Sequence, residues 1–169
     1  MTTVTCSCGA AALDLDGPPI LAAECHCTSC RAAAERFAAP VTEPNSGTRF
    51  VLQRKDKAKV VKGEAHLASF RLSDDASTQR IVATCCNAPM WLEFKGGHWI
   101  SVYAARWPQG EAPRPELRTM TKDASGTLSD DLPNAKTQSA GFMGRLFWAW
   151  VQMGFRNPPV ADVRRTLND

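Results

Sequence analysis

The sequence predicts a mainly β fold followed by a helical C-terminal extension. Up to about residue 105, short runs of alternating or β-forming residues are separated by turns that contain Gly and Pro. One pair of runs, 91–94 and 98–103, flanks Lys95-Gly96-Gly97 in the pattern of a β-hairpin. Near the C-terminus, residues 141–155 carry apolar side chains at helical spacing.

The expected strands follow one another closely in the first part of the chain. Runs at 3–8 and 11–16 flank a turn at Cys8-Gly9-Ala10, and Gly17-Pro18-Pro19 stops the second run. Residues 31–37 are rich in helix formers and predict one or two helical turns. The remaining strands are expected at 20–27, 48–53, 59–62, 65–72, 79–85, 91–94 and 98–103.

The composition changes after Trp107, where Pro, Gly and Asp interrupt any regular pattern. We therefore divide the chain into a zinc-binding β domain over 1–105, an irregular surface segment over 106–140 and a helical C-terminal extension over 141–169. The extension holds the helix at 141–155 and a short second helix at 160–167. The apolar face of the first helix is expected to contain Phe142, Leu146, Phe147, Trp150, Val151 and Met153.

The apolar helix admits three roles. At about 1.5 Å per residue, the segment 142–155 is roughly 20 Å long, which is shorter than the ~30 Å hydrocarbon core of a membrane. We therefore expect no membrane span. The helix can dock on an exposed sheet face, form a homodimer or lie on a membrane surface, although it lacks the Lys- and Arg-rich face typical of membrane-surface helices.

Composition and charge exclude several classes of protein. The 169 residues suit one domain with an appendage, and 44% hydrophobic with 22% charged residues is typical of a globular protein. The formal charge of +3, without a block of Lys and Arg, predicts no nucleic-acid partner. Residues 1–5 lack the basic and apolar regions of a signal peptide, so we expect a cytoplasmic protein with reduced thiols.

Seven cysteines lie in three groups, and their number and spacing indicate metal binding. An odd number does not suit a full disulfide framework. A structural zinc takes four ligands, typically as two close pairs. Cys6 and Cys8 form one pair, and Cys85 and Cys86 are the candidate partners, because any other choice would break up the central triplet.

The central triplet, Cys25-x-Cys27-x-x-Cys30, offers three thiolates to a second zinc. Three protein ligands leave a fourth position for water or substrate, which is the pattern of a catalytic zinc. That position would suit a soft external thiolate or a polarised carbonyl. Seven cysteines divide into four and three without remainder, and two such sites would lower the net charge from +3 to about zero.

Other interpretations of the cysteines stay open. They could be buried structural thiols or redox cysteines. Both sites could also be structural, with His26, His66 or His98 completing the second. An iron–sulfur cluster is disfavoured, because the spacing differs from the usual four-cysteine runs.

Three short motifs follow one another along the chain. They are Cys6-Ser7-Cys8-Gly9-Ala10, Cys25-His26-Cys27-Thr28-Ser29-Cys30-Arg31, and Arg80 ahead of the late cysteines and Ala88-Pro89-Met90. Together they resemble the glutathione-dependent formaldehyde-activating enzyme family, which includes the centromere protein V type domain. The resemblance covers roughly residues 3–105. It implies a β-tent fold, in which small antiparallel sheets surround a structural zinc and a second zinc lies nearby.

The resemblance also implies a division of labour between the two zinc ions. Cys6, Cys8 and the late cysteines correspond to the structural zinc ligands of the family. The triplet that begins at Cys25 corresponds to the ligands of the catalytic zinc, where glutathione and formaldehyde meet as S-hydroxymethylglutathione.

The sequence departs from the family pattern at two places. The late motif of the family is Cys-x-x-Cys-Gly. Here the first position is Ala83, and Cys85 would replace the missing first cysteine. Cys86 aligns with the second cysteine, and Asn87 replaces the Gly. A Gly that usually follows Cys-Arg is absent, because residues 32–37 occupy its place. Adjacent cysteines reach one ion only if the backbone turns there, and Asn87-Ala88-Pro89 favours such a turn.

The sequence thus predicts a zinc-dependent carbon–sulfur lyase, or a related enzyme that acts on a thiol–aldehyde adduct, with two zinc ions and a small thiol such as glutathione as partner. The adduct would react at the zinc held by Cys25, Cys27 and Cys30. A non-catalytic zinc module that serves stability or partner binding is the alternative.

Overall fold

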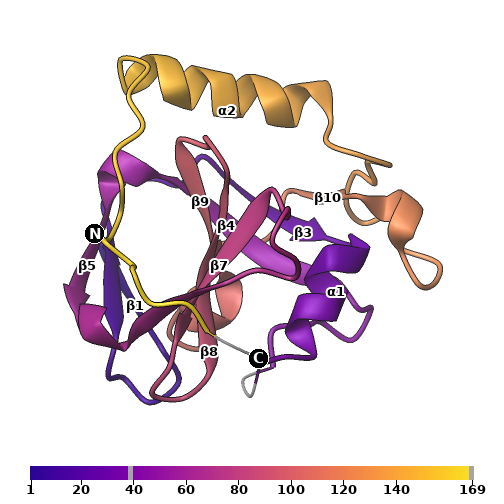
Figure 1. Ribbon diagram of the computed structural model, residues 1–169. Helices are drawn as coiled ribbons and strands as arrows, with labels where there is room; N and C mark the ends of the chain where they lie inside the picture. Colours follow the sequence, from indigo (N-terminus) through magenta and orange to yellow (C-terminus); the bar gives the residue numbers. More distant parts are fainter. Residues whose placement is uncertain (38–39, 168–169) are drawn as a thin grey trace.

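The computed structural model describes residues 1–37 and 40–167, which form two β-sheets and two α-helices (Figure 1). The smaller sheet has the strand order β1-β2-β5, and the larger has the order β10-β3-β4-β9-β8-β7-β6. All neighbouring strands are antiparallel except β3 and β10. The fold is therefore mainly β, as the sequence predicts.

The strands are β1 (Thr2–Thr5), β2 (Ala12–Leu15), β3 (Leu21–Cys25), β4 (Thr48–Arg54), β5 (Ala58–Lys62), β6 (Leu67–Phe70), β7 (Thr78–Ala83), β8 (Ala88–Phe94), β9 (Trp99–Tyr103) and β10 (Leu117–Thr119). The helices are α1 (Thr28–Ala34) and α2 (Ala140–Gln152), and short 3-10 helices lie at Lys55–Lys57, Glu64–His66, Ala104–Arg106 and Thr121–Asp123.

The larger sheet is apolar on both faces because its strands alternate between two cores. In the β8–β9 hairpin, Trp91 pairs with Val102, and both lie in a core that includes Leu13 of the smaller sheet. The next residue, Leu92, belongs to a second core with Leu146 of α2. Successive side chains of a strand point to opposite faces, so one sheet supports the smaller sheet on one side and α2 on the other.

Helix α1 begins directly inside the cysteine triplet. Cys27 is its N-cap, and the Cys27 sulfur accepts a hydrogen bond from the Cys30 backbone N–H at 3.3 Å. The sequence predicts this helix over 31–37, three residues later than its observed start. Helix formers alone mark the interior of a helix, whereas here a thiol, which is not a usual capping side chain, sets the first turn.

Helix α2 runs across the top of the molecule in Figure 1, above β9 and β4. Its buried residues, Leu146 and Ala149, face the larger sheet, and the Leu146 carbonyl accepts a hydrogen bond from Nε2 of His98 at 2.7 Å. Phe147 and Trp148 are more than half exposed on the outer side. The apolar face that contacts the sheet is therefore narrower than the sequence pattern indicates.

The second short helix expected at 160–167 is absent, and that prediction is wrong. Residues 160–167 run without helical structure beside the edge strand β6. Ser69 donates from its backbone N–H to the Arg165 carbonyl at 2.8 Å, and Leu167 donates to the Ser69 carbonyl at 2.9 Å. Pairing with an unprotected sheet edge satisfies these backbone groups in place of a helical turn.

The segment 106–140 contains one short strand, β10, which lies parallel to β3. The Arg118 backbone N–H and carbonyl also pair with the loop at Pro133 and Ala135. The division of the chain at residues 105 and 140 stays a prediction. None of the helices within 1–37 and 40–167 combines the length and the apolar character that a membrane crossing needs.

We predict that acid weakens the contact between α2 and the sheet through His98. Burial lowers the pKa of His98 below its usual 6.5, so the unfolded chain binds more protons than the folded chain just below that pH. The stability that neutral His98 contributes is present above pH 6.5 and is lost as the pH falls through its folded-state pKa. Denaturant unfolding at pH 7.5 and pH 5.5 measures this loss.

The variant His98→Asn should lose less stability than the wild type between those two pH values. His66→Asn, at an exposed histidine, is the control and should behave as the wild type does. Tryptophan fluorescence follows the unfolding, and two of the five tryptophans, Trp99 and Trp150, have rings within 5.0 and 5.4 Å of the His98 ring between centroids. Equal losses in the wild type and His98→Asn would contradict the prediction.

Candidate metal centres

Four cysteine sulfurs from two separate segments, 6–8 and 85–86, meet at one end of the core. The Sγ atoms of Cys6, Cys8, Cys85 and Cys86 all lie within 4.8 Å of one another. The Cys6–Cys8 distance is 3.6 Å, the Cys8–Cys85 distance is 3.3 Å and the Cys85–Cys86 distance is 4.0 Å. The structure therefore places both members of the adjacent pair beside the first pair.

Two backbone turns allow this convergence. Gly9, just after Cys8, has φ +72°, a left-handed conformation that glycine adopts without a steric penalty. Asn87, just after Cys86, has φ +48°. Asn is among the residues that best tolerate this conformation, so it can replace the glycine of the family pattern. Ala83, which stands where the family has its first late cysteine, lies in β7 and is fully buried. Cys85, in the turn after β7, supplies the sulfur beside the cluster instead.

The other three cysteines gather at the junction of β3 and α1. The Sγ atoms of Cys25, Cys27 and Cys30 lie within 4.8 Å of one another, and the Cys25–Cys30 distance is 3.9 Å. Cys25 ends β3, Cys27 caps α1 and Cys30 is buried inside its first turn. Within the described ranges, neither cysteine cluster includes a histidine.

The spacing of the sulfurs fits a tetrahedral metal ion. A zinc–sulfur bond of about 2.3 Å puts the ligands of a tetrahedral zinc about 3.8 Å apart. The sulfur–sulfur distances within the two clusters, from 3.3 to 4.0 Å for five of the pairs, lie around that value. They are far longer than the ~2.05 Å of a disulfide, and all seven cysteines are free. Both clusters could therefore hold a metal ion, and thiolate sulfur is a donor that suits zinc.

The three thiols of the triplet differ in how readily they ionise. Hydrogen bonds from Cys25 and Cys30 lower the pKa of Cys27 to about 2. The hydrogen bond with Cys27 raises the pKa of Cys25 to about 11, and the hydrogen bonds with Cys25 and Cys27 raise the pKa of Cys30. Cys27 is therefore the thiol of this cluster that ionises most readily. A divalent cation would remove the remaining protons, which makes metal binding pH-dependent.

A buried arginine accompanies the triplet. Arg80 on β7 is fully buried and donates from Nη2 to the Ser29 hydroxyl at 3.0 Å. Its Nε and Nη1 atoms have no hydrogen-bond partner, and no ion pair found among residues 1–37 and 40–167 involves it. An uncompensated buried charge costs several kcal/mol. The nearby thiolate of Cys27 is therefore the natural counter-charge.

The four-cysteine cluster has an equivalent arginine. Arg106 is buried and donates from Nη1 to the Ser7 hydroxyl at 2.8 Å, while its Nε atom has no hydrogen-bond partner. Burial lowers the pKa of Arg106, and the thiolates of Cys86 and Cys6 oppose that shift. In both clusters, a serine that lies between two cysteines in the sequence accepts a hydrogen bond from a buried arginine.

A polar network on the other side of the triplet orients His26. The His26 side chain is fully buried, and its Nε2 atom lies 2.8 Å from Oε1 of Glu24. Asn45 and Arg118 donate to the same oxygen at 2.8 and 3.0 Å. Burial raises the pKa of Glu24, but these three hydrogen bonds outweigh it and lower the pKa overall. His26 is thereby directed to Glu24 rather than to the cysteine sulfurs.

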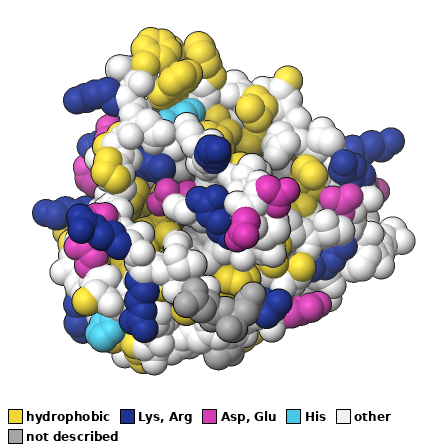
Figure 2. All heavy atoms as spheres, in the orientation of Figure 1, with side chains coloured by type: hydrophobic (Ala, Val, Ile, Leu, Met, Phe, Trp, Pro, Cys, Tyr) yellow, Lys and Arg dark blue, Asp and Glu magenta, His cyan; other side chains and the backbone are white. Residues whose placement is uncertain are grey.

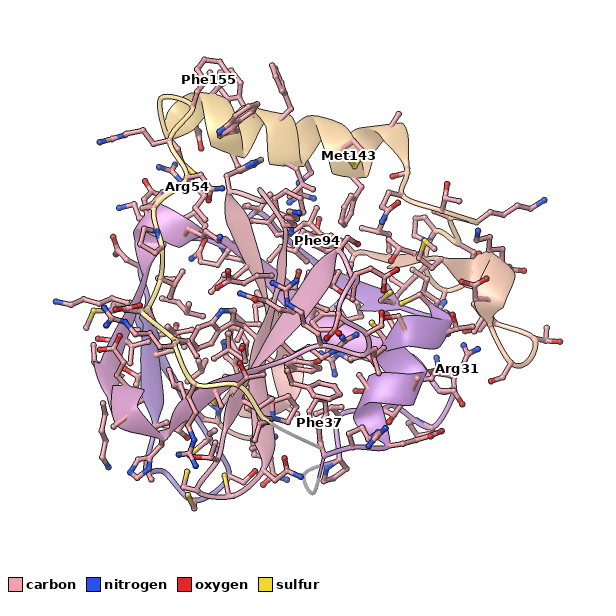
Figure 3. All side chains as sticks on the ribbon, in the orientation of Figure 1. Arg31, Phe37, Arg54, Phe94, Met143 and Phe155 are labelled. Atoms are coloured by element: carbon pink, nitrogen blue, oxygen red, sulfur yellow. The ribbon has the colours of Figure 1, made fainter. Side chains whose placement is uncertain are left out.

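The triplet opens into a cavity of about 500 Å³. Its walls come from β3, β4, β7, β8, β9 and the end of β10, from α1, from the first turns of α2 and from the loops beside them. The lining residues are Ala23, Cys25, Cys27, Thr28, Ser29, Cys30, Phe50, Leu52, Ser77, Thr78, Arg80, Leu92, Phe94, Trp99, Ser101, Thr119, Met120, Asp123, Gln138, Phe142, Met143 and Leu146. We call this cavity the triplet pocket. Figure 3 shows Phe94 beneath α2 and Met143 on the helix above it.

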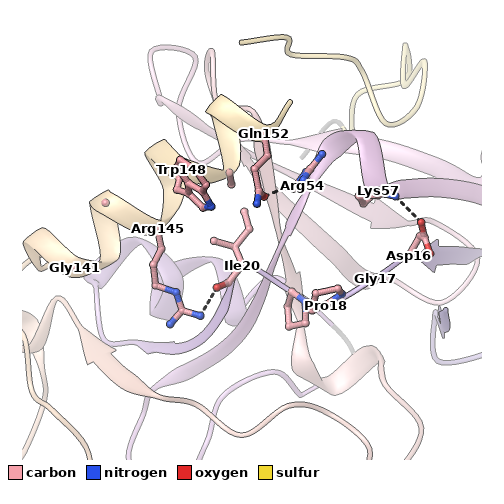
Figure 4. Close-up of a pocket in the computed structure, with 13 residues that line it drawn as sticks. Asp16, Gly17, Pro18, Ile20, Arg54, Lys57, Gly141, Arg145, Trp148 and Gln152 are labelled. Carbon is pink, nitrogen blue, oxygen red and sulfur yellow. Dashed lines mark hydrogen bonds and ion pairs between the residues drawn. The ribbon is translucent and has the colours of Figure 1, made fainter. Parts of the chain in front are cut away.

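A second cavity, of about 480 Å³, lies on another flank of α2 (Figure 4). No cysteine lines it. Its charged residues are already paired, since Arg54 contacts Asp56, Lys57 contacts Asp16 and Arg145 contacts Glu116. It therefore offers no group for the thiol chemistry that the cysteines suggest, and the triplet pocket is the candidate functional site.

Sequence reasoning missed three parts of this site. Arg80 was recognised only as part of a motif, although a charged residue inside an apolar strand is a signal for a buried counter-charge. Neither Glu24 nor Arg118 stood out, because their pairing depends on the contact of β3 with β10. The helical pattern places Phe142 on an apolar face without indicating a pocket, and it does not single out Met143, although both line the triplet pocket.

Comparison with known proteins identifies the family of the chain. The family model described as glutathione-dependent formaldehyde-activating enzyme matches residues 1–123. The chain belongs to this family.

The match of the formaldehyde-activating enzyme family includes all seven cysteines, together with Arg80, Arg106 and Arg118. It ends before α2. A crystal structure of a Rhodobacter sphaeroides protein is 19% identical and matches over 66% of this chain and 92% of that chain, with a TM-score of 0.47. No match was found among curated proteins.

We predict that each buried arginine supports metal binding at its own cluster. Arg80→Met keeps an apolar side chain in place of the arginine stem and removes the charge beside Cys27. We expect the metal affinity of the three-cysteine cluster to fall about tenfold or more, as is typical when groups around the ligands are lost. Arg106→Met should weaken the four-cysteine cluster in the same way.

Competition with a chromophoric chelator measures both affinities. Arg71→Met, at an exposed arginine after β6, serves as the control and should leave both unchanged. Unchanged affinity in Arg80→Met and Arg106→Met, with the fold intact by circular dichroism, would show that the arginines do not balance thiolate charge.

Proposed function

We propose that this member of the formaldehyde-activating enzyme family is a zinc-dependent carbon–sulfur lyase that makes or breaks a thiol–aldehyde adduct in the triplet pocket. One observation carries the proposal most directly. The four-cysteine cluster offers enough sulfurs for a complete tetrahedral site, whereas the cluster that lines the pocket offers three. A three-ligand site beside a cavity can accept one more ligand from a substrate.

The proposed reaction is an addition without oxidation or reduction. The sulfur of the thiol bonds to the aldehyde carbon, and the electron pair of the C=O π-bond moves to the oxygen. That oxygen takes up the proton that the thiol releases. The reverse reaction breaks the carbon–sulfur bond and returns the thiol and the aldehyde.

The roles of the chain follow from the contacts of the pocket. Cys25, Cys27 and Cys30 would hold the zinc, which, when bound, supplies a Lewis acid that lowers the pKa of a thiol and polarises a carbonyl. Arg80 would balance the excess negative charge of the three thiolates from its buried position. The apolar side chains of Phe94 and Trp99 would exclude water and so strengthen these interactions.

The proposed thiol is glutathione, as the description of the family suggests. A reducing compartment such as the cytoplasm would keep the seven free thiols available for metal. Four thiolates at Cys6, Cys8, Cys85 and Cys86 would hold a second, structural zinc.

Metal counting with a thiol titration tests the proposed function. We expect two zinc ions per chain in the wild type and one in Cys30→Ser, with the fold retained. In the cobalt-substituted protein, glutathione or 2-mercaptoethanol should change the thiolate-to-cobalt absorption band, and Cys30→Ser should lose that response. Cys6→Ser is the matched variant at the other cluster, and it should lower the melting temperature but keep the response.

A single tightly held metal ion that responds neither to thiols nor to Cys30→Ser would overturn the lyase proposal. That result would favour the alternative, a non-catalytic zinc module for stability or partner binding. Unfolding of Cys30→Ser but not of Cys6→Ser would mean that the triplet is the structural site.

We also propose that the outer face of α2 forms a homodimer through residues 142–155. Figure 2 shows hydrophobic side chains gathered at the top of the molecule, where α2 lies in Figure 1. Phe147, Trp148 and Phe155 are each more than half exposed. The charged residue of the helix, Arg145, pairs with Glu116 at 2.6 Å. Within Ala140–Gln152 no other residue carries a charge that could meet anionic lipid, so this face favours a second copy over a membrane surface.

Sedimentation equilibrium tests the dimer. The wild type should dimerise, and Trp148→Lys should weaken the association at least about tenfold, because a charge would enter an apolar interface. Leu72→Lys, at an exposed leucine after β6, is the control and should not change it. A monomeric wild type at high concentration would exclude this interface.

A further inference from the structure

The triplet pocket has two kinds of lining. Besides the cysteines, the polar and charged side chains of the lining are Thr28, Ser29, Ser77, Thr78, Arg80, Ser101, Thr119, Asp123 and Gln138. The remaining part of the wall is apolar and includes four aromatic rings. It contains Phe50, Leu52, Leu92, Phe94 and Trp99 from the sheet, and Phe142, Met143 and Leu146 from α2. A ligand that fills the pocket with its reactive atom at the cysteines must therefore carry a substantial apolar group.

The charges of the pocket lead to the same conclusion. Of the described residues that line it, Arg80 and Asp123 carry a formal charge. Arg80 is fully buried and already contacts Ser29. Glutathione carries two carboxylates and an ammonium group, whereas this lining offers one guanidinium and one carboxylate. At least one carboxylate of such a thiol would therefore have to lie in solvent at the mouth of the pocket.

Helix α2 supplies an apolar wall that lies outside the family match. Phe142 packs against the core beneath the helix, and Met143, which is half exposed, lies where the pocket meets solvent. On the sheet side, the rings of Phe94 and Trp99 are 5.6 Å apart between centroids and form a continuous aromatic surface. A cavity of about 500 Å³ between these surfaces is much larger than the one-carbon group of formaldehyde requires.

We infer that the substrate of the triplet pocket is a carbon–sulfur adduct with an apolar group of aromatic or branched-alkyl size, and that Phe142 and Met143 of α2 determine this specificity. The inference rests on the proposed function for the reacting sulfur. The apolar group can belong to the aldehyde half or to the thiol half of the adduct, because either half places it between α2 and the sheet.

Two pairs of probes distinguish these sources in calorimetric titrations of the zinc-loaded protein. Benzyl mercaptan against 2-mercaptoethanol tests an apolar group on the thiol half. S-benzylglutathione against S-methylglutathione tests an apolar group on the aldehyde half. In at least one pair, the benzyl compound should bind about tenfold or more tightly, because a ring would be buried against the aromatic wall.

Matched variants on α2 locate the contact. Phe142→Ala should reduce the preference for the benzyl compound at least about fivefold. Phe147→Ala, on the exposed side of the same helix, should leave it within about twofold of the wild type. Met143→Glu is a second variant at a half-exposed position that tolerates a polar side chain. It should also reduce the preference, and it keeps the test valid if Phe142→Ala loosens the helix.

Cobalt absorption separates this inference from the proposed function. A benzyl preference that depends on Phe142 or Met143 supports the apolar specificity even if no thiol alters the cobalt band, and in that case only the lyase proposal fails. If thiols alter the band but neither benzyl compound is preferred, the specificity inference is overturned. A preference that Phe142→Ala and Met143→Glu leave unchanged would also overturn it, because the apolar contact would then lie elsewhere.

Discussion

The balance of negative and positive charge inside the β scaffold is the constraint on which the rest of this structure depends. Two clusters bring seven thiols to within bonding reach of a metal ion, and each cluster becomes anionic when its thiols ionise. Arg80 and Arg106 lie buried beside them and donate to Ser29 and Ser7. Burying a thiolate or a guanidinium group without a counter-charge costs free energy. Each group lowers that cost for the other.

Local backbone geometry delivers the sulfurs to these clusters. The left-handed turn at Asn87 lets two adjacent cysteines face one point, and the Cys27 cap folds the triplet around the start of α1. The ion pair of Glu24 with Arg118 links β3 to β10. The contact of Glu24 with His26 directs the imidazole away from the sulfurs. The cysteines of both clusters thus lie at strand ends, at a helix start and in short turns rather than in long loops, an arrangement that would favour a preorganised metal site.

Helix α2 lies after the residues that the family model matches, and its two faces have different surroundings. Its inner face closes the triplet pocket with Phe142 and Leu146, and its outer face leaves Phe147 and Trp148 exposed. One helix therefore links the chemistry that the family suggests to a pocket wall that the family model does not include. The lyase that we propose would, with this wall, accept an organic group larger than the one-carbon unit of formaldehyde.

The sequence by itself determined the β class, the β8–β9 hairpin, the helix near residues 141–155 and the grouping of cysteines into four and three, because strand alternation, turn residues and ligand spacing are local signals. It did not determine the start of α1, the chain path over 160–167 or the partners of Arg80 and Glu24. Those depend on a thiol cap, on a free sheet edge and on segments far apart in the chain. The triplet pocket was likewise decided by the tertiary structure alone, since helical periodicity marks an apolar face but cannot say whether Phe142 packs into a core or lines a cavity.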